Sequence, residues 1–547
     1  MEYFSIPFDV SLLKNHILKD PIVDWFNIKE KEDNNYKKDN DTFYKDFIIK
    51  EWNEYKSNFF NFLKNKANIN IDIQEHTSIE ETKKFVEEGK PLILGAKLLY
   101  DDMIVHTDIL IDVQLFSYCF PKIKNYPLHS IKNKYIIINL SFSSLNLKSD
   151  LKECLDEGYI PYKRCLLFSF SQCFSRYFGY EPEKFIIGKE YYYKKTQLPK
   201  DEFISHVITN EKTTLKFIRA YNWINVIRTQ WKTLAINDKP SRKELYPNMN
   251  IKDSEWENEK LRLANRIKEI TLVWNISYEE RCLFHQKNIF CWDDPKLLSE
   301  LKESKKKSIQ ERMIHMNKCD EIIVYPRKNV TNALREVLKE TETNNIFFDV
   351  ESFLTIDEKV DFFNGGEDKY DNPVLAIIGF YYKKDFYDYT IQNFKIESEK
   401  NIVKSFSEKL WNIYNDYGRI NIFHWGHAES KYMDYIHKKH PDIEFPEYIL
   451  VDLLDHFRLE PIIVKGVFKF GIKSIGKALY KNGLIETTWD EENNNGLDAM
   501  IKFKEICKKD KKIPLKRYLE IQNIIEYNRI DCKVLQEIYF VLKKNYD

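Results

Sequence analysis

The stretch Asn345-Ile-Phe-Phe-Asp-Val-Glu-Ser352 is an apolar segment that carries two acidic residues two positions apart. Side chains in a β-strand point alternately to its two faces, so this segment predicts a strand with Asp349 and Glu351 on the same face. Two neighbouring carboxylates on a mostly buried strand repel each other and lose hydration, so a cation must neutralise them. Mg²⁺ and Mn²⁺ bind oxygen ligands and fit such a pair. The alternative is a strand that ends at the surface with both acids in water.

The segments that follow predict alternating strands and helices. Apolar residues at strand and helix spacing predict three strands, a helix, a fourth strand and a second helix. In order, these elements are 346–351, 374–382, 387–391, 398–414, 420–424 and 428–438. Their order is similar to the opening of an RNase H-like fold, which implies a mixed sheet with flanking helices in the C-terminal domain.

Two further segments carry acidic residues that fit the first pair. In Ile422-Phe-His-Trp-Gly-His-Ala-Glu-Ser430, a predicted strand is followed by a turn, and Glu429 begins the next helix. In Glu526-Tyr-Asn-Arg-Ile-Asp-Cys532, Tyr527 and Asp531 are four residues apart and share one face of a predicted helix. Taken singly, Glu429 is interpreted more simply as a helix-capping acid and Tyr527 as a packing residue. The occurrence of all three segments in this order favours one shared site.

Together these residues resemble the DEDD 3′–5′ exonucleases, in the subgroup that has Tyr ahead of the last Asp. The likeness is to the YprB-like RNase H branch and covers roughly residues 345–545. One position differs, because Glu429 stands where the DEDD pattern has Asp. Other segments that resemble this branch are Val451-Asp-Leu-Leu454, Phe470-Gly-Ile-Lys-Ser-Ile475 and Asn495-Gly-Leu-Asp-Ala-Met500.

The resemblance implies a metal-dependent exonuclease that hydrolyses DNA or RNA, with a single-stranded 3′ end as substrate and two Mg²⁺ or Mn²⁺ ions as cofactors. It implies that Asp349 bridges both ions, and that Glu351 and Asp531 hold the ion beside the nucleophile. Glu429 would bind or orient the other ion, and Tyr527 would position the attacking water. A helicase or a replication or repair protein is the implied partner. The alternative is a nucleic-acid-binding scaffold in which two nuclease-like folds are idle.

Basic residues near the acidic segments are candidates for nucleic-acid binding. The chain has 85 basic and 85 acidic residues and no net charge, so any phosphate-binding surface must be local. Lys473 and Lys477 lie four residues apart, and Lys516 and Arg517 end a second basic cluster ahead of Tyr527. We predict that these four basic residues bind nucleic acid, with a solvated surface as the alternative for each.

The N-terminal half contains segments that resemble the RecB-like PD-(D/E)XK nuclease core, a restriction-endonuclease-type α/β fold. They are His106-Thr-Asp-Ile-Leu110, Tyr135-Ile-Ile-Ile-Asn-Leu-Ser-Phe142 and Pro161-Tyr-Lys-Arg-Cys-Leu-Leu-Phe168. Active members have Asp in the first segment, Asp/Glu-x-Lys in the second and usually Gln on the helix. Asp108 fits the first position, but Asn139, Ser141 and Cys165 stand at the others. We therefore predict an inactive fold retained for binding or scaffolding, with an unrelated α/β domain as the alternative.

The length of 547 residues exceeds what one hydrophobic core supports, so we predict an α/β protein of several domains. Within its helical middle, long amphipathic helices are predicted at 255–273 and 297–316. The predicted division has a helical or irregular region at 1–75, the inactive RecB-like fold at 76–200, a helical linker at 201–340 and the RNase H-like exonuclease domain at 341–547.

Cysteine usage and the absence of apolar runs indicate the compartment. The nine cysteines lack the paired spacing of zinc ligands, so neither zinc nor an iron–sulfur cluster is expected. No signal peptide is evident, and no apolar run approaches the roughly 20 residues of a membrane span. We predict an intracellular protein of the cytoplasm or nucleus, not secreted and with no membrane partner. The layout and the heavy use of Lys, Asn, Ile, Tyr and Phe resemble uncharacterised proteins of large DNA viruses.

Overall fold

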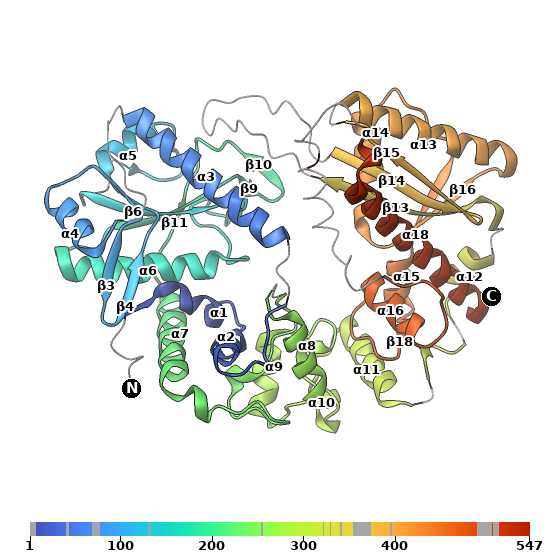
Figure 1. Cartoon of the computed structure of the whole chain (residues 1–547), viewed down its shortest axis with the longest axis horizontal. Helices are drawn as coiled ribbons and strands as arrows, with labels where there is room; N and C mark the ends of the chain where they lie inside the picture. The colour runs from blue at the N-terminus through green and yellow to red at the C-terminus, as the bar shows by residue number, and fades with distance from the viewer. Residues whose placement is uncertain are drawn as a thin grey trace. The chain divides into compact units, whose positions relative to one another are not determined.

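The computed structural model divides into two compact units (Figure 1). Unit 1 ends at Ile267 and unit 2 begins at Lys268, so the boundary lies inside the segment predicted as a helical linker. Among the described residues, no helix is long and apolar enough to pass through a bilayer. The described residues are 7–39, 43–67, 77–128, 131, 133–252, 255–320, 322–328, 330–339, 342–353, 374–393, 396–489, 506 and 514–546.

Unit 1 is built on a five-stranded mixed sheet with the strand order β11-β8-β6-β5-β2. The pairs β2/β5, β5/β6 and β8/β11 are antiparallel, whereas β6 and β8 are parallel. The parallel pair needs a crossover, which is the helix α6 (Ile160–Phe178). The strands are β2 (Leu92–Leu94), β5 (Ile109–Asp112), β6 (Tyr135–Ser141), β8 (Glu183–Gly188) and β11 (Ser205–His206).

The burial of the central strand β6 shows that both faces of the sheet in unit 1 are covered. All seven of its residues are buried, as expected of a strand that is covered on both faces. The helix α3 (Phe43–Ala67) packs Phe59 and its neighbours on one face, and α6 lies on the other (Figure 1). The remaining elements are β1 (Phe8–Asp9), α1 (Lys14–Ile17), α2 (Ile22–Glu32), α4 (Ile79–Glu87), β3 (Lys97–Tyr100), β4 (Met103–His106), α5 (Val113–Cys119), β7 (Leu145–Asn146), β9 (Tyr191–Tyr193), β10 (Thr196–Leu198), α7 (Glu211–Gln230) and α8 (Glu257–Arg266).

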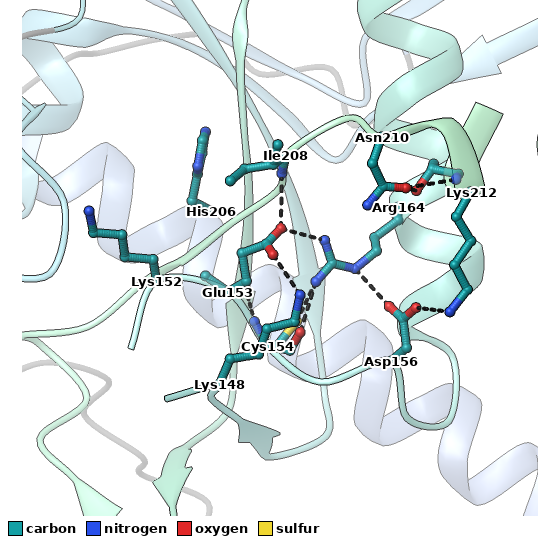
Figure 2. A network of polar contacts seen from close by, with 12 residues as sticks. Lys148, Lys152, Glu153, Cys154, Asp156, Arg164, His206, Ile208, Asn210 and Lys212 are labelled. Carbon is teal, nitrogen blue, oxygen red and sulfur yellow. Dashed lines mark hydrogen bonds and ion pairs between the residues drawn. The ribbon is translucent and has the colours of Figure 1, made fainter. Parts of the chain in front are cut away.

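A buried arginine on α6 fastens the loop that follows β7 (Figure 2). The Arg164 guanidinium, 4 % exposed, donates to Glu153 Oε1 at 3.0 Å and to the Cys154 carbonyl at 2.8 Å. Its Nε lies 2.9 Å from Asp156 Oδ1. The same Glu153 accepts from Lys148 Nζ and from the backbone N–H of Ile208. Because loss of either partner would leave a charge buried and unpaired, this network fixes the loop against α6.

Unit 2 is built on a second five-stranded sheet with the order β15-β14-β13-β16-β17. The first three strands are antiparallel, and β16 and β17 run parallel to β13. This is the mixed sheet with flanking helices that the sequence predicted. The strands are β13 (Asn345–Phe353), β14 (Val374–Tyr382), β15 (Asp385–Thr390), β16 (Ile420–His424) and β17 (Tyr448–Asp452).

The two faces of β13 meet different helices. Ile346, Phe348 and Val350 pack with α13 (Ile396–Tyr417) and α14 (His427–Lys439) on one side. Phe347 packs with the last helix, α18 (Leu519–Tyr546), on the other. Because side chains alternate along a strand, Asp349 and Glu351 lie on the α18 side.

The helical segments before this sheet are shorter than the sequence predicted. The helix predicted at 255–273 ends at Arg266, where α8 stops ahead of Lys268 with its positive φ of 54°. The helix predicted at 297–316 is broken, because Leu301 and Ser304 have extended backbones. The remaining elements of unit 2 are α9 (Tyr278–Gln286), α10 (Pro295–Glu300), α11 (Lys305–Lys318), β12 (Val324–Tyr325), α12 (Asn332–Lys339), α15 (Leu453–Leu459), β18 (Ile463–Val464) and α16 (Ile472–Lys481).

Candidate nuclease centre

Three carboxylates from two elements converge in unit 2. Asp349 and Glu351 project from the central strand β13, and Asp531 projects from α18, which crosses that face of the sheet. One carboxylate oxygen from each lies within 4.8 Å of the others. Donor oxygens of one divalent ion, each at about 2.0–2.6 Å from it, are separated by distances of this order. The three side chains therefore suit a shared cation.

Glu429 joins this group from a third element. It lies in the first turn of α14, after a turn in which Gly426 has a φ of 96° that other residues rarely adopt. Its negative charge acts on both Asp349 and Glu351 and raises their pKa values. The residue is 7 % exposed, and its Oε2 atom is buried with no hydrogen-bond partner. An orphaned carboxylate oxygen beside three other acids fits a site that holds a cation.

The pKa values of all four acids are raised. Burial is the largest cause for Asp349, followed by the negative charges of Asp531, Glu351 and Glu429, and its pKa lies well above the usual range. Burial also raises the pKa of Glu351 to about 8, that of Glu429 to about 7 and that of Asp531 to about 6. A bound cation would favour the charged forms and reverse these shifts.

Two residues that sequence reasoning missed fix the carboxylates in place. The indole Nε1 of Trp489 donates to Asp531 Oδ1 at 2.7 Å, and Asn528 Nδ2 donates to Asp349 Oδ2 at 2.8 Å. Asn528 is a fully buried amide within a helix, a residue type that helix interiors disfavour, and this is the signal that would have singled it out. Trp489 precedes α18 by 30 positions and carries no local signal.

Gly379 leaves the space that Asn528 occupies. It lies opposite Asp349 on β14, and a Cβ placed there would meet Asn528 Oδ1 at 1.6 Å. We expect Gly379→Ala to displace Asn528, destabilise the fold by about 1–3 kcal/mol and weaken divalent-ion binding. Thermal melting and Mn²⁺ titration measure these effects. In an Asn528→Ala background the same substitution should add little, and full additivity of the two changes would contradict this coupling.

The predicted basic residues fall into two places. Lys473 lies on α16 with its Nζ 4.7 Å from the centre of the Tyr527 ring, and its charge lowers the pKa of both Glu351 and Asp531. Lys477 is exposed one turn further along α16. On a separate 3₁₀ turn, Lys516 forms an ion pair with Asp388 of β15 at 2.5 Å, and Arg517 is exposed beside it. Lys473 is thus the one of the four that the structure brings to the acids.

Tyr527 lies beside the carboxylates, as its spacing from Asp531 predicted. Burial, together with the charges of Asp531, Glu351 and Asp349, raises the pKa of its phenol, which therefore keeps its proton. The segment Asn495-Gly-Leu-Asp-Ala-Met500 lies outside the described residues.

The corresponding positions of unit 1 gather no second carboxylate. Asp108 Oδ2 accepts from the backbone N–H of Leu140 at 2.8 Å. Asn139 Oδ1 accepts from the Thr107 hydroxyl and from the backbone N–H of Asp108. Cys165 contacts the Thr213 carbonyl. In the part of the chain that the structure describes, both clusters of three or more acidic, histidine or cysteine side chains close enough to share an ion lie in unit 2.

Comparison with known proteins agrees with the sheet topology of unit 2. Residues 364–543, about a third of the chain, match the model of the RNase H superfamily. The match spans Glu429, Tyr527 and Asp531 and begins after β13, which carries the first two acids. No curated protein and no solved structure matched. The C-terminal part of this chain is therefore an RNase H-like domain.

Proposed function

We propose that the RNase H-like domain is a 3′–5′ exonuclease that hydrolyses phosphodiester bonds of DNA or RNA with two divalent metal ions. The superfamily match supports a nuclease-type activity in general. The observation that carries the specific proposal is the convergence of one carboxylate oxygen each from Asp349, Glu351 and Asp531 within 4.8 Å, with the charge of Glu429 acting on the first two.

Each acid has a distinct part in this proposal. Two Mg²⁺ or Mn²⁺ ions, when bound, would supply an activated water and would neutralise charge on the leaving 3′-oxygen. Asp349, whose pKa is raised by the charges of all three other acids, would contact both ions. Glu351 and Asp531 would hold the ion on the side of the nucleophile. Glu429, with its orphaned Oε2, would hold or orient the other.

Tyr527 and Lys473 complete the proposed centre. The phenol of Tyr527 stays protonated, so it can hold a water near Asp531 through hydrogen bonds without itself acting as a base. Lys473, above the Tyr527 ring, would contact a substrate phosphate, with exposed Lys477 continuing this basic surface along α16. Lys516 and Arg517 would bind nucleic acid further from the acids.

For unit 1, we propose an inactive RecB-like fold that binds nucleic acid or protein. The order of elements along unit 1 supports this proposal: three antiparallel strands are followed by the helix α6 and then by a strand parallel to β6. Asp108 alone supplies too few ligands for Mg²⁺, and the Asn139 amide is already engaged in hydrogen bonds.

Digestion of an end-labelled oligonucleotide tests the proposed polarity. With a 5′-labelled single strand and Mn²⁺, we expect a ladder that shortens from the 3′ end, and a 3′-terminal phosphorothioate linkage should slow it. Asp531→Asn should lose the activity, whereas Asp434→Asn, an exposed acid on α14, should retain it. Parallel DNA and RNA substrates identify the preferred nucleic acid. Internal fragments from a 3′-protected strand would contradict the exonuclease assignment.

A further inference from the structure

A second group of potential metal ligands lies in unit 2. It comprises His427 at the start of α14, Asp452 at the end of β17 and Asp455 in the first turn of α15. One ligand atom from each residue lies within 4.8 Å of the others. None of the three has a part in the proposed nuclease chemistry.

One of the two carboxylate oxygens of Asp452 accepts hydrogen bonds from the backbone. Its Oδ1 atom accepts from the N–H of Gly426 at 2.8 Å and from the N–H of Leu454 at 2.9 Å, so its orientation is fixed. Its Oδ2 atom is buried and has no hydrogen-bond partner. A buried carboxylate oxygen without a partner destabilises the folded protein, so an occupant at this oxygen would stabilise it.

Glu429 also has a carboxylate oxygen without a hydrogen-bond partner, and this oxygen lies near the same turn. The Gly426 peptide donates to Asp452, and its carbonyl accepts from His424 Nδ1 at 2.8 Å. That Nδ1 atom lies 3.8 Å from Glu429 Oε2, which has no hydrogen-bond partner in a residue only 7 % exposed. Asp452 Oδ2 is therefore the unpartnered buried oxygen of the second group, and Glu429 Oε2, which we assign to the acidic centre, lies near the same turn.

The spacing and the ligand types fit a transition metal. His427 Nδ1 lies 3.8 Å from Asp452 Oδ2, too far for a hydrogen bond. Two ligands at about 2.1 Å from one ion are separated by roughly 3.0–4.2 Å, depending on the angle between them. The His427 side chain is 67 % exposed, so an ion has access and the ring is free to turn. One imidazole and two carboxylates suit Mn²⁺, Co²⁺ or Zn²⁺ better than Mg²⁺, which favours oxygen ligands alone.

We propose that His427, Asp452 and Asp455 form a separate divalent-cation site that prefers transition metals over Mg²⁺. An ion there would tie the start of α14 to the end of β17. Because Glu429 follows His427 by two residues, the ion would also hold Glu429 at the edge of the acidic centre. The binding proposed here does not depend on nuclease activity.

A Co²⁺ titration of the full-length protein in excess Mg²⁺ tests this site, because Mg²⁺ occupies sites made of oxygen ligands. Calorimetry should find about one Co²⁺ bound by the wild type and by Asp349→Asn. His427→Ala and Asp455→Asn should each weaken this binding by about tenfold or more. His437→Ala is the matched control, because it removes another exposed histidine of α14 that contacts Tyr448 instead.

The possible results distinguish a failure of this metal site from a failure of the proposed exonuclease function. No Co²⁺ binding in excess Mg²⁺, or equal binding by His427→Ala and wild type, would overturn the site. A protein that binds Co²⁺ at His427 but cleaves no nucleic acid would support the site and reject the exonuclease. Melting curves of His427→Ala and His437→Ala control for folding.

Discussion

Asp349→Asn should lower metal-dependent cleavage by about 10³-fold or more and at the same time raise the melting temperature of the metal-free protein. Asp349 faces the other three acids, and burial and their charges raise its pKa well above the usual range. At alkaline pH, where these acids are ionised, an amide of the same shape removes one charge from this group, and its carbonyl still accepts the hydrogen bond from Asn528. The ligand that contacts both proposed ions is lost while the repulsion decreases.

The two halves of this prediction need separate measurements. Cleavage rates with Mn²⁺ report the loss of activity, and thermal melting in a chelator reports the gain, which we expect to be a few °C. Adding Mg²⁺ should raise the melting temperature of the wild type but hardly that of Asp349→Asn. Asp434→Asn should behave as the wild type in every assay. A variant that melts lower than the wild type without metal would show that Asp349 stabilises the fold by itself.

Metal-free protein should lose stability as the pH rises from about 4 to about 8. The folded-state pKa values of Glu351, Glu429 and Asp531 are raised to about 8, 7 and 6. Below about pH 4 these acids are protonated in both the folded and the unfolded chain, so their burial costs little. Between the unfolded and folded pKa values the unfolded chain releases its protons first, and the free energy of unfolding falls.

Divalent ions should cancel this loss, because they bind the deprotonated acids. Mn²⁺ should therefore raise the melting temperature by several °C near pH 8.5 and scarcely at all near pH 5. Melting curves over this pH range, with chelator or with Mn²⁺, measure the difference. An Asp531→Asn variant should show a smaller dependence on pH in the chelator. A metal-induced increase of equal size at both pH values would mean that the ions bind elsewhere.

Local sequence patterns were sufficient to predict the strands that carry the site. The alternation in Asn345–Ser352 predicted that Asp349 and Glu351 share one face of β13, and the strands at 374–382 and 420–424 have the predicted bounds. These features depend on side-chain period, which neighbouring residues encode. The mixed sheet with flanking helices followed from the order of those elements.

The support around the site depends on contacts that sequence spacing does not reveal. Trp489 reaches Asp531 and Gly379 makes room for Asn528 only because the chain has folded back on itself. The overlong helices predicted at 255–273 and 297–316 have a similar cause. Apolar spacing continues through Ile267 and Leu301, but the backbone turns there to pack short helices. Periodicity indicates which residues are buried and leaves open where the helix stops.

The acidic centre joins the middle strand of a sheet to the last helix, and this has a consequence during synthesis. Asn528 contacts Asp349 from 179 positions further along the chain, and Asp531 follows it. On the ribosome, the acids of β13 therefore lack their contacts from α18 until most of unit 2 has been translated. A growing polypeptide that lacks α18 also lacks Asp531, so this group of acids is complete only after α18 has been made.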